Sequence, residues 1–235
     1  LAGYYIERKP ETLSGIRGVA FRDENKGRDI VHTGWRELMD LSKVPFAYSN
    51  LTEFKNRIIY YESSRGCPFS CSYCLSSIDK KLRFRDIELV KKELQFFIDN
   101  KVPQVKFVDR TFNCKHDHAM EIWRYITEND NGITNFHFEI SADLLRSEEL
   151  ALMKTMRPGL IQLEIGVQST NPQTIKAIRR TMDFEKLKGI VEQIHSFGNI
   201  HQHLDLIAGL PYEGYDSFHK SFCDVYALRP EQFQL

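Results

Sequence analysis

Long apolar runs are missing from this sequence. No stretch approaches the ~18 consecutive apolar residues that a membrane-spanning helix requires, because charged residues or glycine interrupt every candidate within a few positions. Net charge is missing as well, since 32 Lys and Arg balance 32 Asp and Glu. No overall field therefore attracts nucleic acid or anionic lipid, and we expect a soluble protein with neither a membrane nor a nucleic acid as partner.

The composition shows no strong bias, and the chain carries no signal peptide. Hydrophobic residues make up 42% of the sequence, aromatic residues 12% and charged residues 27%, which is typical of globular proteins and argues against disorder, collagen-like repeats and coiled coil. A length of 235 residues allows one large domain or one domain with a partial neighbour. Because the chain opens at Leu1 without an initiator methionine, we expect it to be a segment of a longer protein.

Cysteines are few, and their number is odd. Three of the five, Cys67, Cys71 and Cys74, fall within eight residues, which is too close for an ordinary disulfide framework. This spacing predicts metal ligation in a reducing compartment, and we expect a cytoplasmic location. Cys114 and Cys223 are isolated, and each is predicted to be a small buried hydrophobic residue.

Residues 1–50 differ in pattern from the rest of the chain. Two short alternating runs, 15–22 and 29–32, flank a polar turn and predict a hairpin within an N-terminal linker segment. From residue 51 onwards, short β-rich runs alternate with amphipathic helical stretches. The predicted strands are 57–62, 104–109, 135–141, 160–167 and 203–208, and a sixth begins at 231–235.

Helical stretches of suitable length lie between the predicted strands. In the segment 184–197, for example, apolar residues recur along one helical face, and Gly198 is predicted to end the helix. Strand and helix alternating in this way predict parallel strands with right-handed crossovers. The fold class is therefore α/β, and the pattern fits either a barrel or a doubly wound sheet.

The cysteine cluster follows directly after the first predicted strand. In parallel α/β folds the loops at the carboxyl ends of the strands build the functional site. A structural zinc site and a closed iron–sulfur cluster each need four ligands, so three clustered cysteines with no obvious fourth indicate an open metal position. Two alternatives are a zinc site completed by a distant histidine and three incidental thiols.

Two other groups of residues have simpler interpretations than a site. His116 and His118 lie close to Cys114, but Asn113 is predicted to cap a helix and to leave both histidines on its polar first turn. A minority alternative places Cys114 on the substrate side of the site. The aromatic residues of the leading segment are expected to dock it on a neighbouring core; they are Trp35, Phe46 and Tyr48.

The spacing CxxxCxxC, with Tyr73 as the aromatic residue before the last cysteine, resembles the signature of the radical S-adenosylmethionine (SAM) enzymes. The resemblance covers about residues 57–235 and implies a partial (βα)6 barrel of parallel strands, similar to a TIM barrel and truncated at its sixth strand. It implies that Cys67, Cys71 and Cys74 hold three irons of a 4Fe–4S cluster, that SAM binds the fourth iron, and that Tyr73 packs near the adenine.

Later residues extend this resemblance in the order of the strands. Where the family often has Gly-Gly-Glu facing the SAM amino group, this sequence has 108–111, which makes Asp109 the candidate contact. Glu139 lies where related enzymes place an acidic SAM contact. The segment 164–169 resembles the oxygen-independent coproporphyrinogen oxidases and their relatives, which implies that Gln168 reaches a ribose hydroxyl.

The remaining SAM contacts implied by the resemblance lie further along the chain. Arg180, with Arg179 beside it, matches the arginine that pairs with the SAM carboxylate, a task suited to a planar guanidinium. The segment 205–211 resembles the same oxidases, so that Asp205 contacts ribose and Ile207 lies behind the adenine. Taken one at a time, these residues are equally compatible with surface charges, strand residues or helix caps.

The resemblance implies an enzyme that cleaves SAM reductively and abstracts hydrogen from a small-molecule substrate, with flavodoxin or ferredoxin as its reducing partner. The leading segment resembles the connector after a cobalamin-binding domain in one large subfamily, so cobalamin is expected in the parent protein. Alternatives are an RNA methylthiotransferase-like enzyme, a non-catalytic zinc-binding module and an electron-transfer iron–sulfur protein.

Overall fold

The computed structural model describes residues 11–23, 27–55 and 57–235, and it divides the chain into two compact units. The first unit is Leu1–Asp40 and the second is Leu41–Leu235. The division follows Asp40, so residues 41–50, which the sequence analysis assigned to the N-terminal segment, belong to the second unit.

A short helix and a two-stranded hairpin are described in the first unit. The helix α2 (Glu11–Ser14) precedes strands β1 (Ala20–Asp23) and β2 (Asp29–His32), which pair antiparallel. The hydroxyl of Thr33 accepts a hydrogen bond from the Val19 amide at 3.0 Å and donates one to the Ile16 carbonyl at 2.7 Å. The predicted hairpin is confirmed, although its turn residues 24–26 lie outside the described residues.

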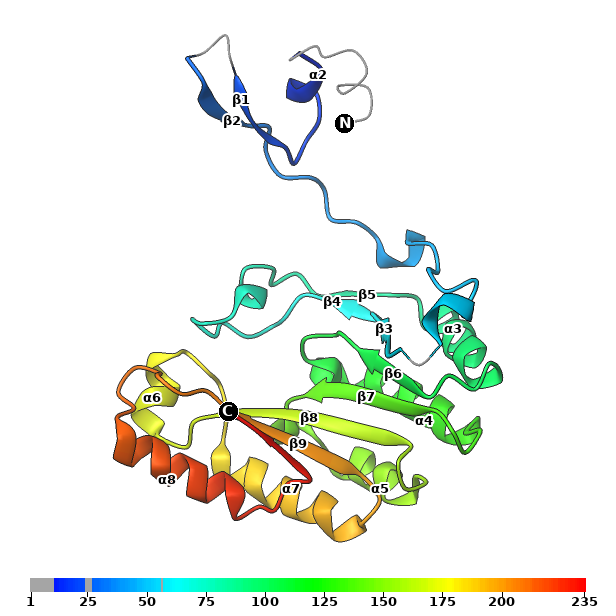
Figure 1. The fold of residues 1–235 in the computed structure, drawn as a ribbon, viewed down its shortest axis with the longest axis vertical. Helices are drawn as coiled ribbons and strands as arrows, with labels where there is room; N and C mark the ends of the chain where they lie inside the picture. Colours follow the sequence, from blue (N-terminus) through cyan, green and yellow to red (C-terminus); the bar gives the residue numbers. More distant parts are fainter. Residues whose placement is uncertain (1–10, 24–26, 56) are drawn as a thin grey trace. The chain divides into compact units, whose positions relative to one another are not determined.

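Six parallel strands form the sheet of the second unit, in the order β10-β9-β8-β7-β6-β3 (Figure 1). Each strand lies beside the next along the chain, as in a partial barrel. The α/β prediction is confirmed, and the structure selects the barrel-like alternative. The strands are β3 (Ile59–Tyr61), β6 (Gln104–Phe107), β7 (Asn135–Ile140), β8 (Ile161–Gln168), β9 (His201–Leu206) and β10 (Gln232–Gln234).

Helices connect successive strands and cover one face of the sheet. The prediction for 184–197 is confirmed: Asp183 caps the helix, accepting a hydrogen bond from the Lys186 amide, and Gly198 ends it with a φ of 68°. The helices are α3 (Ile87–Asp99), α4 (His116–Glu128), α5 (Ser147–Thr155), α6 (Pro172–Ala177), α7 (Phe184–Phe197) and α8 (Tyr215–Tyr226). Within the described ranges, no helix is long and apolar enough to cross a bilayer.

Alternating burial along the strands separates an apolar face from a polar one. In β8, Ile161, Leu163 and Ile165 are fully buried in the core, whereas Glu164 and Gly166 between and beside them are only partly buried. A side chain every second residue points to the same face of a strand. The helices therefore cover the apolar face, and the other face remains available for polar chemistry.

Aromatic residues fill much of the core near β6 and β7. Phe138 is fully buried, with ring centroids 4.5 Å from Phe107 and 4.3 Å from Phe112. The leading residues Phe46 and Tyr48 pack on Phe97 of α3 at centroid distances of 5.5 and 5.6 Å, which confirms the predicted docking of these two residues.

Three local predictions are wrong. Trp35 is 92% exposed and docks on no core, because it follows the two-stranded hairpin of the small first unit. Cys223 is exposed, since the surface of α8 carries it, and Cys114 is only half-buried. The helix α4 begins at His116 and not after Asn113, whose side chain instead bonds both the amide and the carbonyl of Ser141.

Candidate cofactor site

The cysteine loop leaves the sheet after β3 and is closed by a two-residue ladder. Strand β4 (Ser64–Arg65) pairs antiparallel with β5 (Arg83–Phe84), and the three cysteines lie between them, with the 3-10 turn η4 (Leu75–Ser77) after the last. The Ser72 amide donates to the Ile178 carbonyl at 2.9 Å. This bond attaches the loop to the end of α6, on the far side of the sheet's carboxyl edge.

A glycine is required immediately before the first cysteine. Gly66 has a φ of +99°, in the left-handed region that other residues rarely adopt. A Cβ added there would lie 2.7 Å from the Lys81 carbonyl oxygen, which is backbone and cannot move aside cheaply. The amide of Cys67 also donates to the Asp79 carbonyl at 3.2 Å. The two sides of the loop therefore meet closely at Gly66.

Asp109 was expected to contact SAM, but it does not line the pocket. It instead supports the segment that leads into the cysteine loop. Its fully buried carboxylate accepts hydrogen bonds from the Ser63 amide, the Ser63 hydroxyl and the Ser64 hydroxyl at 2.8, 2.7 and 2.6 Å. Burial raises the pKa of Asp109 to about 6. With its acceptors occupied inside the protein, Asp109 has a supporting role, and its neighbours Arg110 and Thr111 line the pocket instead.

The histidines near this network do not form the polar first turn that was predicted. His118 is buried, and its Nε2 lies 3.0 Å from the Ser63 hydroxyl. Burial lowers the pKa of His118 to about 4, so the ring is neutral and can donate to that hydroxyl. His116 lies 3.0 Å from a carboxylate oxygen of Glu149. Burial followed by the nearby Asp109 charge raises the pKa of Cys114 to about 11, so this thiol stays protonated.

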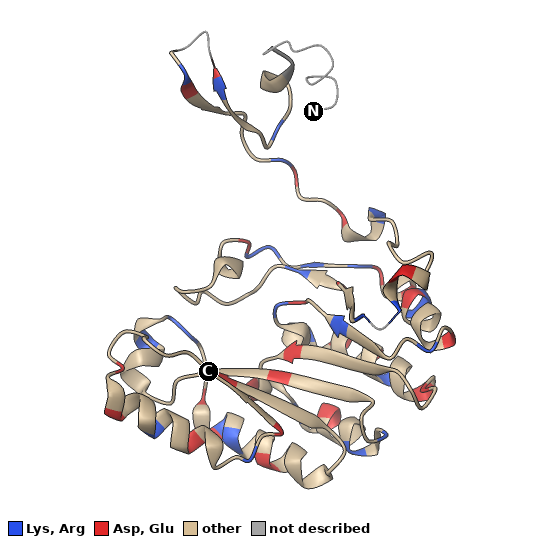
Figure 2. Cartoon of the chain, in the orientation of Figure 1, with Lys and Arg blue, Asp and Glu red and all other residues tan. Residues whose placement is uncertain are grey.

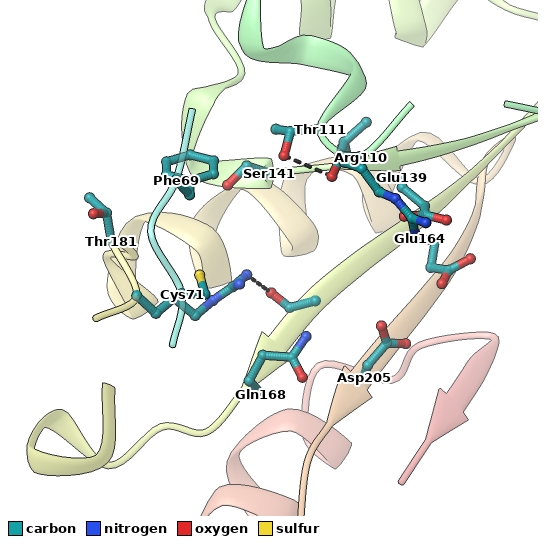
Figure 3. A pocket seen from close by; sticks show the side chains of 13 residues that line it. Phe69, Cys71, Arg110, Thr111, Glu139, Ser141, Glu164, Gln168, Thr181 and Asp205 are labelled. Carbon is teal, nitrogen blue, oxygen red and sulfur yellow. Dashed lines mark hydrogen bonds between the residues drawn. The ribbon is translucent and has the colours of Figure 1, made fainter. Parts of the chain in front are cut away.

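An open pocket joins the cysteine loop to the carboxyl ends of the strands (Figure 3). Four of the predicted SAM contacts line it together with Cys71, although they come from different strands and loops; they are Glu139, Gln168, Arg180 and Asp205. The structure thus brings together side chains that are up to 134 residues apart in the sequence (71 to 205). The sequence analysis missed several other lining residues, among them Phe69, Arg110, Thr111, Gly166 and Thr181.

Two further predicted residues lie beside the pocket. The Tyr73 hydroxyl accepts a hydrogen bond from Arg180 Nη1 at 3.2 Å, and burial raises the pKa of Tyr73 to about 12. The Ile207 amide donates to the Gln168 carbonyl at 3.0 Å. Both residues therefore touch a lining residue of the pocket.

The backbone at the end of β8 is shaped around Gln168. Pairing with β9 shifts register between Gly166 and Gln168, and Gln168 has a φ of +73°, which is unfavourable for a residue other than glycine. A Cβ on Gly166 would lie 2.3 Å from Gln168 Nε2 and 3.5 Å from an Arg180 nitrogen. Gly166 therefore leaves the space that both side chains need, and a glycine inside a strand is the signal that could have identified it.

Three carboxylates of like charge face the pocket. Glu164 lies 2.9 Å from His137 Nε2 and 2.8 Å from Lys106 Nζ, and its contact with His137 is the main cause of a pKa lowered to about 2. Burial, Glu164 and Glu139 together raise the pKa of Asp205 to about 7. Burial and Glu164 also raise the pKa of Glu139. Of the three carboxylates, Glu164 is stabilised by its contacts with Lys106 and His137. The charged forms of Asp205 and Glu139 are therefore destabilised by burial and by repulsion from Glu164.

Some buried polar atoms of the pocket have no partner within the described chain. Gln168 Oε1 and Arg180 Nε are buried without a hydrogen bond. An unpaired buried polar atom costs about 1–3 kcal/mol, and such atoms at the wall of an open pocket are typical of ligand-binding positions. The arrangement fits a ligand that offers both donors and acceptors next to the cysteine loop.

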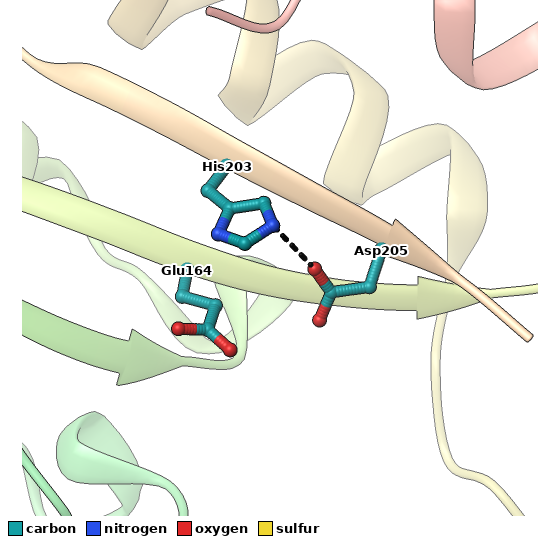
Figure 4. Close-up of side chains that lie close together, drawn as sticks. All are labelled: Glu164, His203 and Asp205. Carbon is teal, nitrogen blue, oxygen red and sulfur yellow. Dashed lines mark ion pairs between the residues drawn. The ribbon is translucent and has the colours of Figure 1, made fainter. Parts of the chain in front are cut away.

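Glu164, His203 and Asp205 are the one group of three among the described residues whose ligand atoms all lie within 4.8 Å of one another (Figure 4). His203 Nε2 lies 3.2 Å from Asp205, and Glu164 already contacts Lys106. We interpret this group as part of a charge network on the inner face of the barrel.

Comparison with known families agrees with this geometry. The profile of the Radical SAM superfamily matches residues 61–223, which includes every lining residue of the pocket. The chain belongs to the radical SAM superfamily. Members bind a 4Fe–4S cluster and SAM, and the free cysteines, together with the unpartnered polar atoms beside them, fit these two groups.

Individual relatives are similar at a low level of identity. The chain is 27% identical over 166 residues to the 2-(S-pantetheinyl)-carbapenam-3-carboxylate methyltransferase of Streptantibioticus cattleyicolor, which covers 67% of this chain and 24% of that protein. It is 26% identical over 178 residues to the bacteriochlorophyllide d C-12(1)-methyltransferase of Chlorobaculum tepidum, covering 73% and 37%. The chain therefore spans well under half the length of these relatives.

The fold also matches a solved radical SAM structure over almost its whole length. TsrM from Kitasatospora setae, a radical SAM methyltransferase solved with cobalamin and a [4Fe-4S] cluster bound, superposes with a TM-score of 0.76 at 17% identity. The match covers 99% of this chain and 47% of that chain. This likeness confirms the radical SAM fold of the second unit.

Substituting Gly66 with alanine should abolish cluster binding. The added Cβ would collide with the Lys81 carbonyl and would also be strained by the positive φ, so the cysteine loop must open. Iron and sulfide content after anaerobic reconstitution measures the effect. Gly189→Ala is the matched control, because this glycine lies within α7 and an added Cβ meets nothing within 4 Å. Full cluster content in Gly66→Ala would contradict the role assigned to this glycine.

Substituting Asp205 with asparagine should stabilise the cofactor-free protein at high pH. The folded pKa of about 7 is above the usual 3.8, so the folded state binds the proton more tightly than the unfolded state. The contribution of Asp205 to stability is thus present at low pH and is lost as the pH rises through about 7. The neutral amide of the variant avoids this loss. We therefore expect the free energy of unfolding to be higher in the variant by on the order of 2 kcal/mol at pH 8 and nearly unchanged near pH 4.

Denaturant unfolding of the two proteins at a series of pH values measures this gain. Asp224→Asn is a control of opposite sign: burial alone would raise the pKa of Asp224, but hydrogen bonds from Lys220 and Thr170 lower it overall. That variant should lose stability at neutral pH. A pH-independent difference between Asp205→Asn and the wild type would contradict the repulsion described above.

Proposed function

We propose that this chain is the catalytic core of an enzyme that cleaves SAM reductively and uses the product to activate a small-molecule substrate. The observation that carries the proposal is the single pocket that joins Cys71 of the cysteine loop to Gln168, Arg180 and Asp205. When bound, the cluster and SAM supply a low-potential electron and a 5′-deoxyadenosyl radical that abstracts hydrogen from the substrate.

The residues of the chain divide this task among them. Cys67, Cys71 and Cys74 ligate the cluster and leave one iron open. The Arg180 guanidinium, which is oriented by the Tyr73 hydroxyl, binds the SAM carboxylate. The side chain of Gln168, whose Oε1 has no partner, binds a ribose hydroxyl.

The carboxylates and Ile207 complete the SAM site. Asp205 accepts a hydrogen bond from a ribose hydroxyl. This bond stabilises a carboxylate that is buried and repelled by Glu164 and Glu139. Glu139 lies on β7, two strands away from Asp205 in the sheet, and pairs with the SAM amino group, since Asp109 is occupied elsewhere. Ile207, whose amide holds the Gln168 carbonyl, lies behind the adenine.

We further propose that the full protein transfers a methyl group and uses cobalamin. The support is that the two curated relatives described above and TsrM are methyltransferases, and that TsrM was solved with cobalamin and a [4Fe-4S] cluster bound. The first unit, with its hairpin, is then the connector that follows a cobalamin-binding domain.

The electron is proposed to come from an acidic carrier of the flavodoxin or ferredoxin type. Exposed Lys80 and Lys81 form a basic stretch on the cysteine loop itself (Figure 2), and Lys80 donates to Ser70 at 2.7 Å, only one residue before Cys71. Exposed Arg179 flanks the same segment, because Ile178 beside it accepts from the Ser72 amide. Positive charge on both sides of the cluster ligands suits an anionic donor.

Anaerobic reconstitution with iron and sulfide, followed by dithionite and SAM, tests the proposed cleavage. We expect 5′-deoxyadenosine from the wild type and a loss of at least 100-fold in Cys71→Ala, because a ligand to the cluster is missing. Cys223→Ala is the matched control, since this cysteine lies on the exposed surface of α8 and should change nothing. Zinc in place of iron and sulfide in the wild type would overturn the proposal.

Charge reversal at Lys80 and Lys81 tests the proposed docking of the donor. We expect the ratio of flavodoxin-driven to dithionite-driven SAM cleavage to fall about tenfold in the double variant with glutamate, and the flavodoxin-driven rate of the wild type to fall as salt is raised. Lys92→Glu on α3 serves as the control for an exposed lysine elsewhere. An unchanged ratio would exclude this surface as the docking site.

A further inference from the structure

We propose that the Thr111 hydroxyl donates a hydrogen bond to the Cys67 sulfur of the bound cluster and thereby raises the cluster's reduction potential. The inference rests on the proposed function, because it takes Cys67 as a cluster ligand. It gives Thr111, which lies in the segment 108–111 but was assigned no role there, a measurable effect on electron uptake.

The geometry places the hydroxyl against the ligand sulfur. Thr111 Oγ1 lies 3.6 Å from Cys67 Sγ, within the range of a hydrogen bond to sulfur. Both side chains are buried, with 7% of Thr111 and 9% of Cys67 exposed. Thr111 also lines the pocket that contains Cys71.

The backbone around Thr111 is held firmly, which fixes this contact. On one side, Asp109 bonds to Ser63 and Ser64, which lead into the cysteine loop. On the other side, Phe112 is fully buried, and the Cys114 amide donates to the Thr111 carbonyl at 3.0 Å. The same network thus fixes both the threonine and the segment that leads through β4 into Cys67.

The direction of the hydrogen bond follows from the chemistry of the two groups. In the cofactor-free protein the Thr111 hydroxyl donates to the Arg110 carbonyl at 2.8 Å, and the Cys67 thiol can donate to the Thr111 oxygen. A cysteine that ligates iron is a thiolate and can only accept. The hydroxyl is then the donor of this pair, and rotation about its C–O bond is enough to direct the proton to sulfur.

A donor to a ligand sulfur favours the reduced cluster. Reduction adds one electron and one negative charge without making or breaking a covalent bond, and the charge is shared with the ligand sulfurs. A hydrogen bond in a buried site stabilises this extra charge, so the reduction potential rises. Removing the donor should therefore make the cluster harder to reduce while leaving its ligands in place.

An anaerobic redox titration of the reconstituted protein without SAM tests the proposal. Dithionite with viologen mediators supplies the electron, and the electron paramagnetic resonance of the reduced cluster gives the reduced fraction. In Thr111→Val, which keeps the shape and loses the hydroxyl, we expect the ratio of reduced to oxidised cluster at a fixed potential to fall about tenfold, a shift of about 59 mV for one electron. Thr111→Ser should stay within about threefold of the wild type.

Thr181→Val is the matched control, because Thr181 lines the same pocket, whereas the hydroxyl that lies against the Cys67 sulfur is that of Thr111. Equal potentials for the wild type and Thr111→Val at equal iron content, or an equal shift in Thr181→Val, would overturn the proposal. If Thr111→Val does not hold a cluster, Thr111→Ala takes its place. If Thr111→Val and Thr111→Ala both lose the cluster while Thr111→Ser retains it, the hydroxyl has only a structural role. That result would also overturn the proposal. Absence of a cluster in the wild type is a different result, which contradicts the proposed function itself.

Discussion

Parallel pairing of the strands is the constraint on which the site depends. Because every strand of the sheet runs in the same direction, all carboxyl ends meet at one edge, and the loops that follow them are neighbours. The cysteine loop after β3 therefore faces the ends of β7, β8 and β9. A hydrogen bond between Ser72 and Ile178 completes the enclosure by attaching the loop to the far side of that edge.

The pocket at this edge is poorly satisfied without a ligand. Asp205 and Glu139 repel Glu164, Gln168 adopts a backbone conformation that disfavours its side chain, and the Arg180 Nε has no partner in the described chain. Each of these features costs stability in the cofactor-free protein. A ligand that supplies donors to the carboxylates and an acceptor to the guanidinium relieves the repulsion and the missing hydrogen bond together, so binding energy is available at several points of contact.

The cysteine loop, in contrast, is well supported from within the protein. Asp109 carries three hydrogen bonds from the two serines before the loop, and Gly66 allows the loop to close tightly on itself. Thr111 continues the same support to the Cys67 sulfur. The protein thus combines a preorganised ligand loop for the metal with a strained pocket for the organic cofactor, and the segment 109–111 contributes to both.

Much of this was readable from the sequence, since it depends on local patterns. Period-two runs and amphipathic helices predicted the six strands and the α/β class, and the spacing of Cys67, Cys71 and Cys74 predicted a metal site on the loop after the first strand. The resemblance to family motifs also pointed to Gln168, Arg180 and Asp205, and the structure places all three at one pocket. These signals are short in range, so they survive without knowledge of the tertiary structure.

Only the tertiary structure decided what each side chain faces. Asp109 follows β6 and Asp205 lies near the end of β9, yet Asp109 alone points into a buried serine network, because β3 and β6 are neighbours in the sheet. His118 and Thr111 acquire their partners, Ser63 and Cys67, across 55 and 44 residues. Burial and hydrogen bonds between distant segments depend on packing, and packing is the property that local sequence patterns do not contain.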